Sequence, residues 1–114
     1  MNLMIGQRKT GAVMVLYLNG RIVVGEESAR FLETLKELAA GGEKRILLNL
    51  AEVTYMDSAG LGALVRSCTA VAKQKGQLKL LNVPAKIETL LRITKLHHLF
   101  ETFDDEAAAV ASFT

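Results

Sequence analysis

The feature that most constrains the fold is an alternation of short apolar runs with segments of helical periodicity. Runs at 12–18, 45–50 and 78–83 are typical of strands, and the first of them is apolar on both faces. Between the first two runs, apolar residues such as Phe31 and Leu35 recur at helical spacing. Strand, helix and strand in that order form a parallel unit with a right-handed crossover. The sequence therefore predicts a layered α/β fold.

Turn and cap residues divide the first half of the chain. Residues 4–9 predict a strand, which the turn Thr10-Gly11 joins to the run at 12–18 as a hairpin, so the sheet is mixed. We expect Asn19-Gly20 to end that second strand. A helix then opens at 25–27, with acidic residues in its first turn, and Gly41-Gly42 ends it with a left-handed cap.

The second half continues the alternation. Residues 51–60 are expected to connect the strand at 45–50 to a second helix, which Gly76 ends. Pro84 sets the first turn of a third helix, 99–103 predicts a short edge strand, and a final helix covers 107–112. We expect one domain over residues 1–114, with a mixed sheet of four to five strands and helices packed mainly on one face. The buried stripe of the second helix is predicted to be Leu61, Leu64, Val65, Cys68, Val71 and Ala72.

Composition excludes several classes of function. Half of the 114 residues are apolar, so a hydrophobic core can form without metal or disulfide crosslinks. The net charge is only +2 and no long basic run occurs, so direct binding of nucleic acid is not expected. The run at 12–18 is too short to span a bilayer, and the single Cys68 excludes an intrachain disulfide and a cysteine zinc cluster. We expect a soluble cytoplasmic protein without membrane insertion, metal or cofactor.

The segment 55–62 (YMDSAGLG) has the most unusual composition. It joins a buried strand to a helix, and Ser58 is placed where an N-cap belongs, with Asp57 as the alternative. Gly60 and Gly62 fall in the first helical turn, although glycine costs about 1 kcal/mol per helical position relative to alanine. Two explanations stay open: close packing of this helix, or close approach of a partner's backbone or a phosphate group.

These residues carry a resemblance to a known family. The segment from Leu47 to Gly62, with its central Asp-Ser-Ala-Gly-Leu-Gly, resembles the signature of STAS domains. This family includes anti-sigma-factor antagonists and domains of sulphate transporters. Asn19-Gly20-Arg21-Ile22 is similar to the family's early turn. The chain departs from the pattern at 22–25, which is apolar where many relatives carry an acidic residue, and at Ala59, where a second serine is frequent.

The resemblance implies a regulatory switch. In antagonists of this family, a partner that is both serine kinase and anti-sigma factor phosphorylates the motif serine. The unmodified antagonist binds that partner and frees the sigma factor, whereas the phosphorylated form releases it. The corresponding acceptor is Ser58, with a phosphatase as a further partner that would reset it. The implied contact surface consists of Asp57, Ser58, Ala59, Gly60, Leu61 and Gly62.

Two other functions remain open. A STAS subunit of a lipid-trafficking transporter or of a stress-signalling complex would dock its partner constitutively through the same surface. A small hydrolase or nucleotide-binding enzyme is disfavoured, because no histidine base accompanies Ser58 and no glycine-rich phosphate loop occurs. His97-His98 lack the partners of a metal site, and Cys68 is expected to be a buried small hydrophobe. We therefore expect a binding module and not an enzyme.

Overall fold

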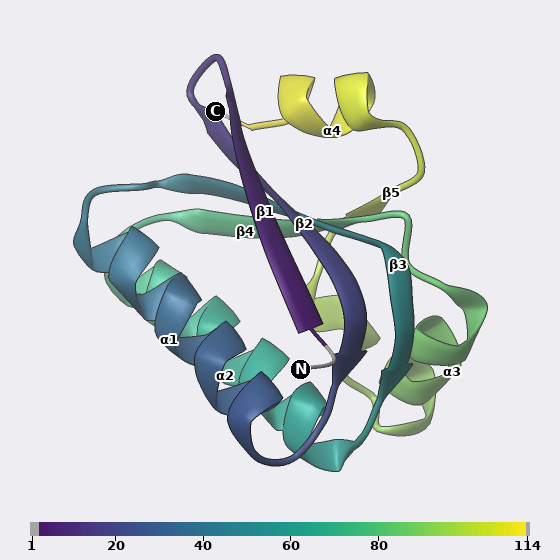
Figure 1. The fold of residues 1–114 in the computed structure, drawn as a ribbon. Coiled ribbons are helices and arrows are strands. Elements are labelled where there is room, and N and C mark those ends of the chain that lie inside the picture. The colour runs from purple at the N-terminus through teal and green to yellow at the C-terminus, as the bar shows by residue number, and fades with distance from the viewer. Residues whose placement is uncertain (1–2, 114) are drawn as a thin grey trace.

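The structure, a computed structural model, describes residues 3–113 and forms one mixed sheet with helices on both sides (Figure 1). In chain order the elements are β1 (Leu3–Thr10), β2 (Val13–Ile22), α1 (Glu26–Ala40), β3 (Arg45–Met56), α2 (Ser58–Lys73), β4 (Gln77–Leu81), α3 (Ala85–Ile93), the 3-10 turn η1 (His97–Leu99), β5 (Thr102–Phe103) and α4 (Glu106–Ala111).

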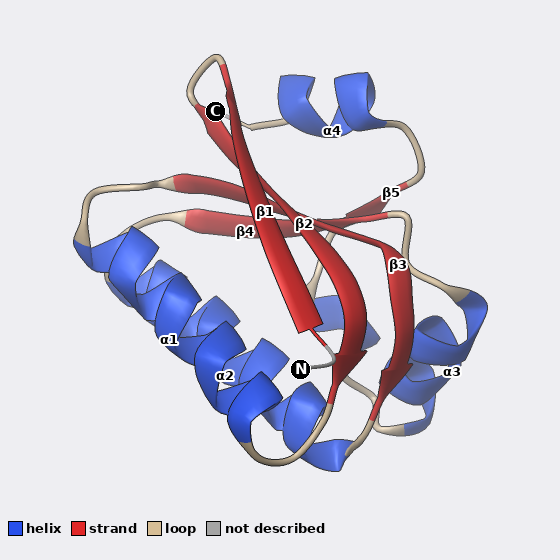
Figure 2. Cartoon of the chain, in the orientation of Figure 1, coloured by secondary structure: helices blue, strands red, loops and turns tan. Residues whose placement is uncertain are grey.

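The order of the strands in the sheet explains where the helices lie. The strands follow one another as β1-β2-β3-β4-β5, with β1 antiparallel to β2 and the remaining pairs parallel. Each crossover therefore steps to the next strand in the same direction. Since such crossovers are right-handed, their helices fall on one face of the sheet. Figure 2 shows α1 and α2 side by side on that face and α4 across the sheet from them.

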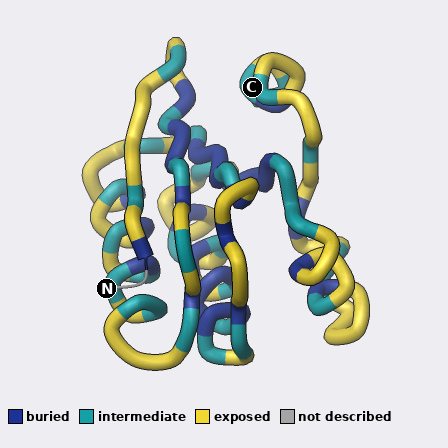
Figure 3. The backbone as a smooth tube through the Cα atoms, turned by 45° about the vertical axis from the view of Figure 1, so that its right-hand side comes forward, coloured by how far each residue is buried: buried dark blue, intermediate teal, exposed yellow. Residues whose placement is uncertain are grey.

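The main core lies between this helical face and the sheet, and buried segments gather there (Figure 3). Phe31 of α1 and Leu64 of α2 are fully buried against Leu48 of β3. The adjacent Leu47 points to the other face, where Ala109 of α4 covers it in a second, smaller cluster. Both faces of β3 are therefore covered, which accounts for the lack of apolar–polar alternation in the run at 45–50.

Helix α4 is held partly by a buried lysine. The Lys79 side chain is almost fully buried in the sheet, and its ammonium donates to the carbonyl of Ser112 at 3.1 Å and to its Oγ at 3.0 Å. Glu101 Oε1 lies 3.1 Å from the same nitrogen. The ring centroid of Phe113 is 4.7 Å away, within cation–π range. Burial of this charge is thus offset by hydrogen bonds, an ion pair and an aromatic ring.

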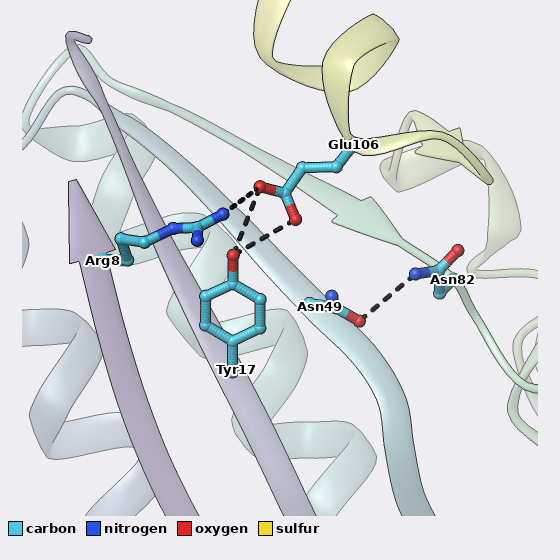
Figure 4. Close-up of polar contacts among 5 residues, drawn as sticks. All are labelled: Arg8, Tyr17, Asn49, Asn82 and Glu106. Carbon is cyan, nitrogen blue, oxygen red and sulfur yellow. Dashed lines mark hydrogen bonds and ion pairs between the residues drawn. The ribbon is translucent and has the colours of Figure 1, made fainter. Parts of the chain in front are cut away.

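A second polar group ties the start of α4 to the hairpin (Figure 4). Glu106 lies 2.9 Å from the Arg8 guanidinium and accepts from the Tyr17 hydroxyl at 3.2 Å. Burial raises the pKa of Tyr17, and the Glu106 carboxylate raises it further. Figure 4 also shows Asn82, which follows β4 and whose amide donates to Asn49 at 3.5 Å, where the pairing of β3 with β4 ends.

The predicted element order and mixed sheet are confirmed, but two strands are longer than predicted. Asn19-Gly20 does not end β2; the strand continues to Ile22 through register shifts on either side of this pair. The predicted connection at 51–60 is wrong, because β3 runs on to Met56 in parallel pairing with β2. Pairing of β3 with β4 ends earlier, at Asn49, so the last part of β3 has a strand on one side only.

The Lys79 contacts generate a prediction. Lys79→Met keeps an apolar stem next to the Phe113 ring but removes the ammonium and its hydrogen bonds. We expect the free energy of unfolding to fall by about 1.5–3 kcal/mol, the range for hydrogen bonds to a charged group. Amide hydrogens of α4 should then exchange faster, while those of α2 keep their relative protection. Urea denaturation and hydrogen exchange measure both effects. Lys36→Met, at an exposed position of α1, is the control, and unchanged protection of α4 would contradict the assignment.

Candidate functional site

The unusual segment lies where two parallel strands end. The last residues of β2 and β3, Ile22 and Met56, are paired, and the chain turns from them into α1 and α2. In open α/β sheets, binding sites are commonly found beyond the carboxyl ends of the strands. Two loops thus meet here, the β2–α1 loop at 23–25 and the β3–α2 junction at Asp57.

Asp57 connects these two loops. It is the N-cap of α2: its Oδ1 accepts from the Gly60 amide at 2.8 Å. Its Oδ2 accepts from the Val24 amide at 2.9 Å. The hydrogen bonds from Val24 and then Gly60 hold the pKa of Asp57 below its ordinary value, so the carboxylate is ionised at neutral pH.

Ser58 is the first residue of α2 and not its cap. The sequence predicts Ser58 at the N-cap with Asp57 as the alternative, and in the structure Asp57 is the cap. Asp57 takes that position because its two carboxylate oxygens reach the Gly60 amide of α2 and the Val24 amide of the β2–α1 loop, whereas a hydroxyl has one oxygen. Ser58 is exposed, and its hydroxyl makes no hydrogen bond to any residue between 3 and 113. Its side chain is therefore free of a local structural task.

The two positions in the first turn of α2 differ in whether the structure requires glycine there. A Cβ on Gly60 would lie 2.0 Å from the backbone oxygen of Ile22, so only glycine lets α2 approach the end of β2 this closely. A Cβ on Gly62 would meet only the guanidinium of Arg66, at 3.3 Å. Close packing thus explains Gly60. It does not require Gly62, which leaves a bare patch on the outer side of the helix.

The predicted contact residues differ in exposure. Ser58 is exposed, and Asp57, Ala59 and Gly62 are half-buried. Gly60 and Leu61 are buried, so Leu61 packs into the core and offers no side chain to a partner.

The structure adds two residues that sequence analysis did not assign to the site. Val24, held by Asp57, is 70% exposed, and Tyr55 is 51% exposed with the Arg21 guanidinium 5.6 Å from its ring centroid. The signal for Val24 was the apolar stretch at 22–25. Exposed apolar side chains such as these are suited to contact with another protein.

Other candidate features among the described residues would be a metal site, a reactive thiol or a membrane-spanning helix. Among the described residues, no group of three or more His, Cys, Asp or Glu side chains could hold a metal ion. Cys68 is half-buried, less than predicted, and burial raises the pKa of its thiol, which makes it a poor nucleophile at neutral pH. In residues 3–113 no helix is long and apolar enough to cross a bilayer.

Comparison with known proteins now identifies the family. Residues 5–109 match the family model of the STAS domain. The chain belongs to the STAS domain family. The predicted resemblance to this family is thereby confirmed over residues 5–109.

Two relatives are named as antagonists of anti-sigma factors. This STAS chain is 37% identical over 67 residues to the anti-sigma-B factor antagonist of Staphylococcus aureus. That match covers 59% of this chain and 62% of the relative, so it spans about three-fifths of the relative's length. A Bordetella bronchiseptica protein, BtrV, named as a candidate anti-sigma factor antagonist, is 29% identical over 108 residues, 92% of this chain and 90% of its own.

Solved structures confirm the fold. A candidate anti-sigma factor antagonist from Thermotoga maritima superposes with a TM-score of 0.87 at 23% identity, covering 96% of this chain and 94% of its own. The Bacillus cell fate determinant SpoIIAA in its phosphorylated form gives 0.73 at 17%, with 95% and 98% covered. A sulfate transporter family protein from Wolinella succinogenes gives 0.71 at 20%, with 91% and 86% covered. At these identities the likeness shows the STAS fold.

The two glycines offer a matched pair of variants. Gly60→Ala places a methyl group against a backbone oxygen, so we expect a loss of about 3 kcal/mol or more, comparable to severe overpacking. Gly62→Ala meets only a mobile guanidinium and gains helix propensity, so we expect no loss and up to about 1 kcal/mol of stabilisation. Urea denaturation of both variants tests this. Equal stability of the two would contradict the close approach at Gly60.

The Asp57 bridge predicts a pH dependence. The pKa of Asp57 is lower in the folded chain than its ordinary value of 3.8, so its stabilising contribution is complete above that value. The contribution is lost as the pH falls through the folded pKa. Asp57→Asn retains a capping oxygen without the charge. We expect its thermal midpoint to fall less steeply than that of the wild type below about pH 4. If the thermal midpoints of the variant and the wild type fell equally steeply with pH, ionisation of Asp57 would not contribute to stability.

Proposed function

We propose that this STAS domain is an anti-sigma-factor antagonist, and that phosphorylation of Ser58 controls its binding to a serine-kinase anti-sigma factor. The observation that carries the proposal is the free, exposed Ser58 hydroxyl at the start of α2, with the capping task performed by Asp57. A phosphate can be added there without breaking a hydrogen bond of the fold. The names of the two sequence relatives support the antagonist role. The fold relative SpoIIAA, solved in phosphorylated and unphosphorylated forms, supports the modification.

The physical effect of the phosphate is local. Phosphorylation adds about −1.5 to −2 charges, and the positive end of the α2 dipole tolerates them within the domain. The ionised Asp57 next to Ser58 makes the modified surface strongly anionic. A partner that covers Val24 and Tyr55 would have to bury this charge unpaired, which is costly. Each 1.4 kcal/mol of that cost weakens binding about tenfold.

The direction of the switch follows. The unmodified domain binds the kinase and keeps it from the sigma factor, and the phosphorylated domain releases it. A phosphatase that removes the phosphate restores binding. Because Asp57 and not Ser58 ties the loops together, release needs no rearrangement of α2. Constitutive docking in a transporter or stress-signalling complex is the alternative that the experiment separates.

Affinity capture from native lysate with variant baits tests the proposal. We expect wild type and Ser58→Ala to retain an ATP-binding anti-sigma kinase, and Ser58→Asp to bind it at least about tenfold more weakly. Thr89→Asp, an exposed position of α3, adds the same charge elsewhere and should bind like the wild type. The identified kinase should also transfer phosphate from ATP to Ser58 and not to Ser58→Ala.

Two results would contradict the switch. Equal affinity of Ser58→Ala and Ser58→Asp for the kinase would show that charge at Ser58 does not control binding. Retention of the same transporter or scaffold proteins by every bait would favour constitutive docking. A comparison of amide chemical shifts completes the test, because we expect changes in Ser58→Asp to stay within the first turn of α2 and the adjoining loops.

A further inference from the structure

The outer side of the two parallel helices is hollowed. Between α1 and α2, which lie side by side in Figure 1, is a groove of about 460 Å³, called here the α1–α2 groove. Its apolar lining includes Leu32 and Ala40 of α1 and Ala70 of α2. The alanines leave room for a rod-shaped ligand to approach both helix backbones, as in complexes where a helix binds in a groove.

Three cations line this groove and none is neutralised. Lys36 comes from α1, and Arg66 and Lys73 come from α2, so positive charge stands on both sides. Over residues 3–113 none of the three has an ion pair, and no acidic side chain lines the groove. Elsewhere in the same structure, Arg8 and Lys9 do have carboxylate partners.

The cations of α2 share a face with the start of the helix. At 100° per residue, positions 58, 62, 66 and 73 fall within a stripe of roughly 80°. Gly62 adds to this stripe no side chain that would displace the Arg66 guanidinium, which lies close above it. The two α2 cations that line the groove therefore lie on the same side of the helix as Ser58, which is at its N-terminal end.

We propose that the α1–α2 groove is a docking site for an acidic amphipathic helix of a protein partner. Its apolar stripe would lie on Leu32, Ala40 and Ala70, and its carboxylates would pair with Lys36, Arg66 and Lys73. Charge complementarity favours this occupant, because the described residues that line the groove carry positive charge on both sides and no negative charge. The proposal goes beyond the switch and holds whether or not Ser58 is phosphorylated.

Two other occupants fit less well. A second copy of this chain could offer acidic residues of α1 or α4. Glu33 and Glu37 of α1 share their helix with Lys36, so the like charges of the groove would also meet, and the acidic residues at the start of α4 are already used. Asp105 caps α4, and Glu106 pairs with Arg8 and Tyr17. An anionic membrane surface is broader than a single helix and would extend over Glu33 and Glu37, which are exposed on α1 outside the groove lining. A groove between two helices with small residues in its lining suits a helix better than a bilayer.

Two synthetic peptides of about 16 residues test the proposal directly, with identical apolar stripes and either glutamate or lysine on the flanking positions. In an NMR titration of the full chain, we expect the glutamate peptide to shift amide signals of the second half of α1 and of residues 62–74, and the lysine peptide to shift none. Binding of both peptides alike, or shifts centred on other elements, would overturn the proposal.

Charge-reversal variants supply the second arm. The triple variant Lys36→Glu, Arg66→Glu and Lys73→Glu should bind the glutamate peptide at least tenfold more weakly, whereas Lys86→Glu on α3 should bind it like the wild type. Ala70→Trp fills the groove without changing charge and should weaken binding by a similar factor, which covers the case of a misfolded triple variant. Analytical sedimentation tests for a second copy of the chain. Flotation with phosphatidylserine vesicles tests for binding to an anionic membrane. Dimerisation or vesicle binding that the triple variant abolishes, without binding of the glutamate peptide, would overturn the proposal.

Discussion

The bridge made by Asp57 is the interaction on which the arrangement of the site depends. One carboxylate caps α2 through Gly60 and holds the β2–α1 loop through Val24. It can do both because Gly60 lets the helix start directly against the carbonyl of Ile22. The same bridge relieves Ser58 of any capping task and presents Val24 next to it. Because Asp57 performs the capping, the hydroxyl of Ser58 is left available for modification.

The strand order imposes a second constraint. Successive right-handed crossovers in one direction place α1, α2 and α3 on one face and leave the other face uncovered. The C-terminal segment covers the middle of that second face, and Lys79 and Glu106 hold it there through polar contacts. The parallel course of α1 and α2 also brings Lys36 and Arg66 to the same groove, so the proposed docking groove is a consequence of the topology.

The sequence was sufficient for those features that local patterns determine. The order of elements, the mixed sheet and the motif around Ser58 follow from apolar runs, glycine turns and one short signature. The length of β3 could not be predicted, because its residues after Leu50 are held by pairing with β2 and not by an apolar run. Asp57 and Ser58 are both good N-cap residues, and only the position of the distant Val24 amide decides between them. The α1–α2 groove could not be predicted for a similar reason, because its cations come from two helices that are separated in the sequence.

The unequal pairing of β3 has a consequence for the solubility of the domain. Among the described residues, the strand beyond Asn49 is paired with β2 alone, so its other edge has no neighbouring strand. The start of α3 lies beside this edge, where residues 53–56 and 84–87 line one hollow. Natural proteins protect such edges against strands of other molecules with covering helices, charge and irregular twist. Here Glu52 is exposed on this stretch, and the register shifts against β2 increase the local twist. The irregularities that lengthen the strand past its apolar run therefore also act against edge-to-edge aggregation.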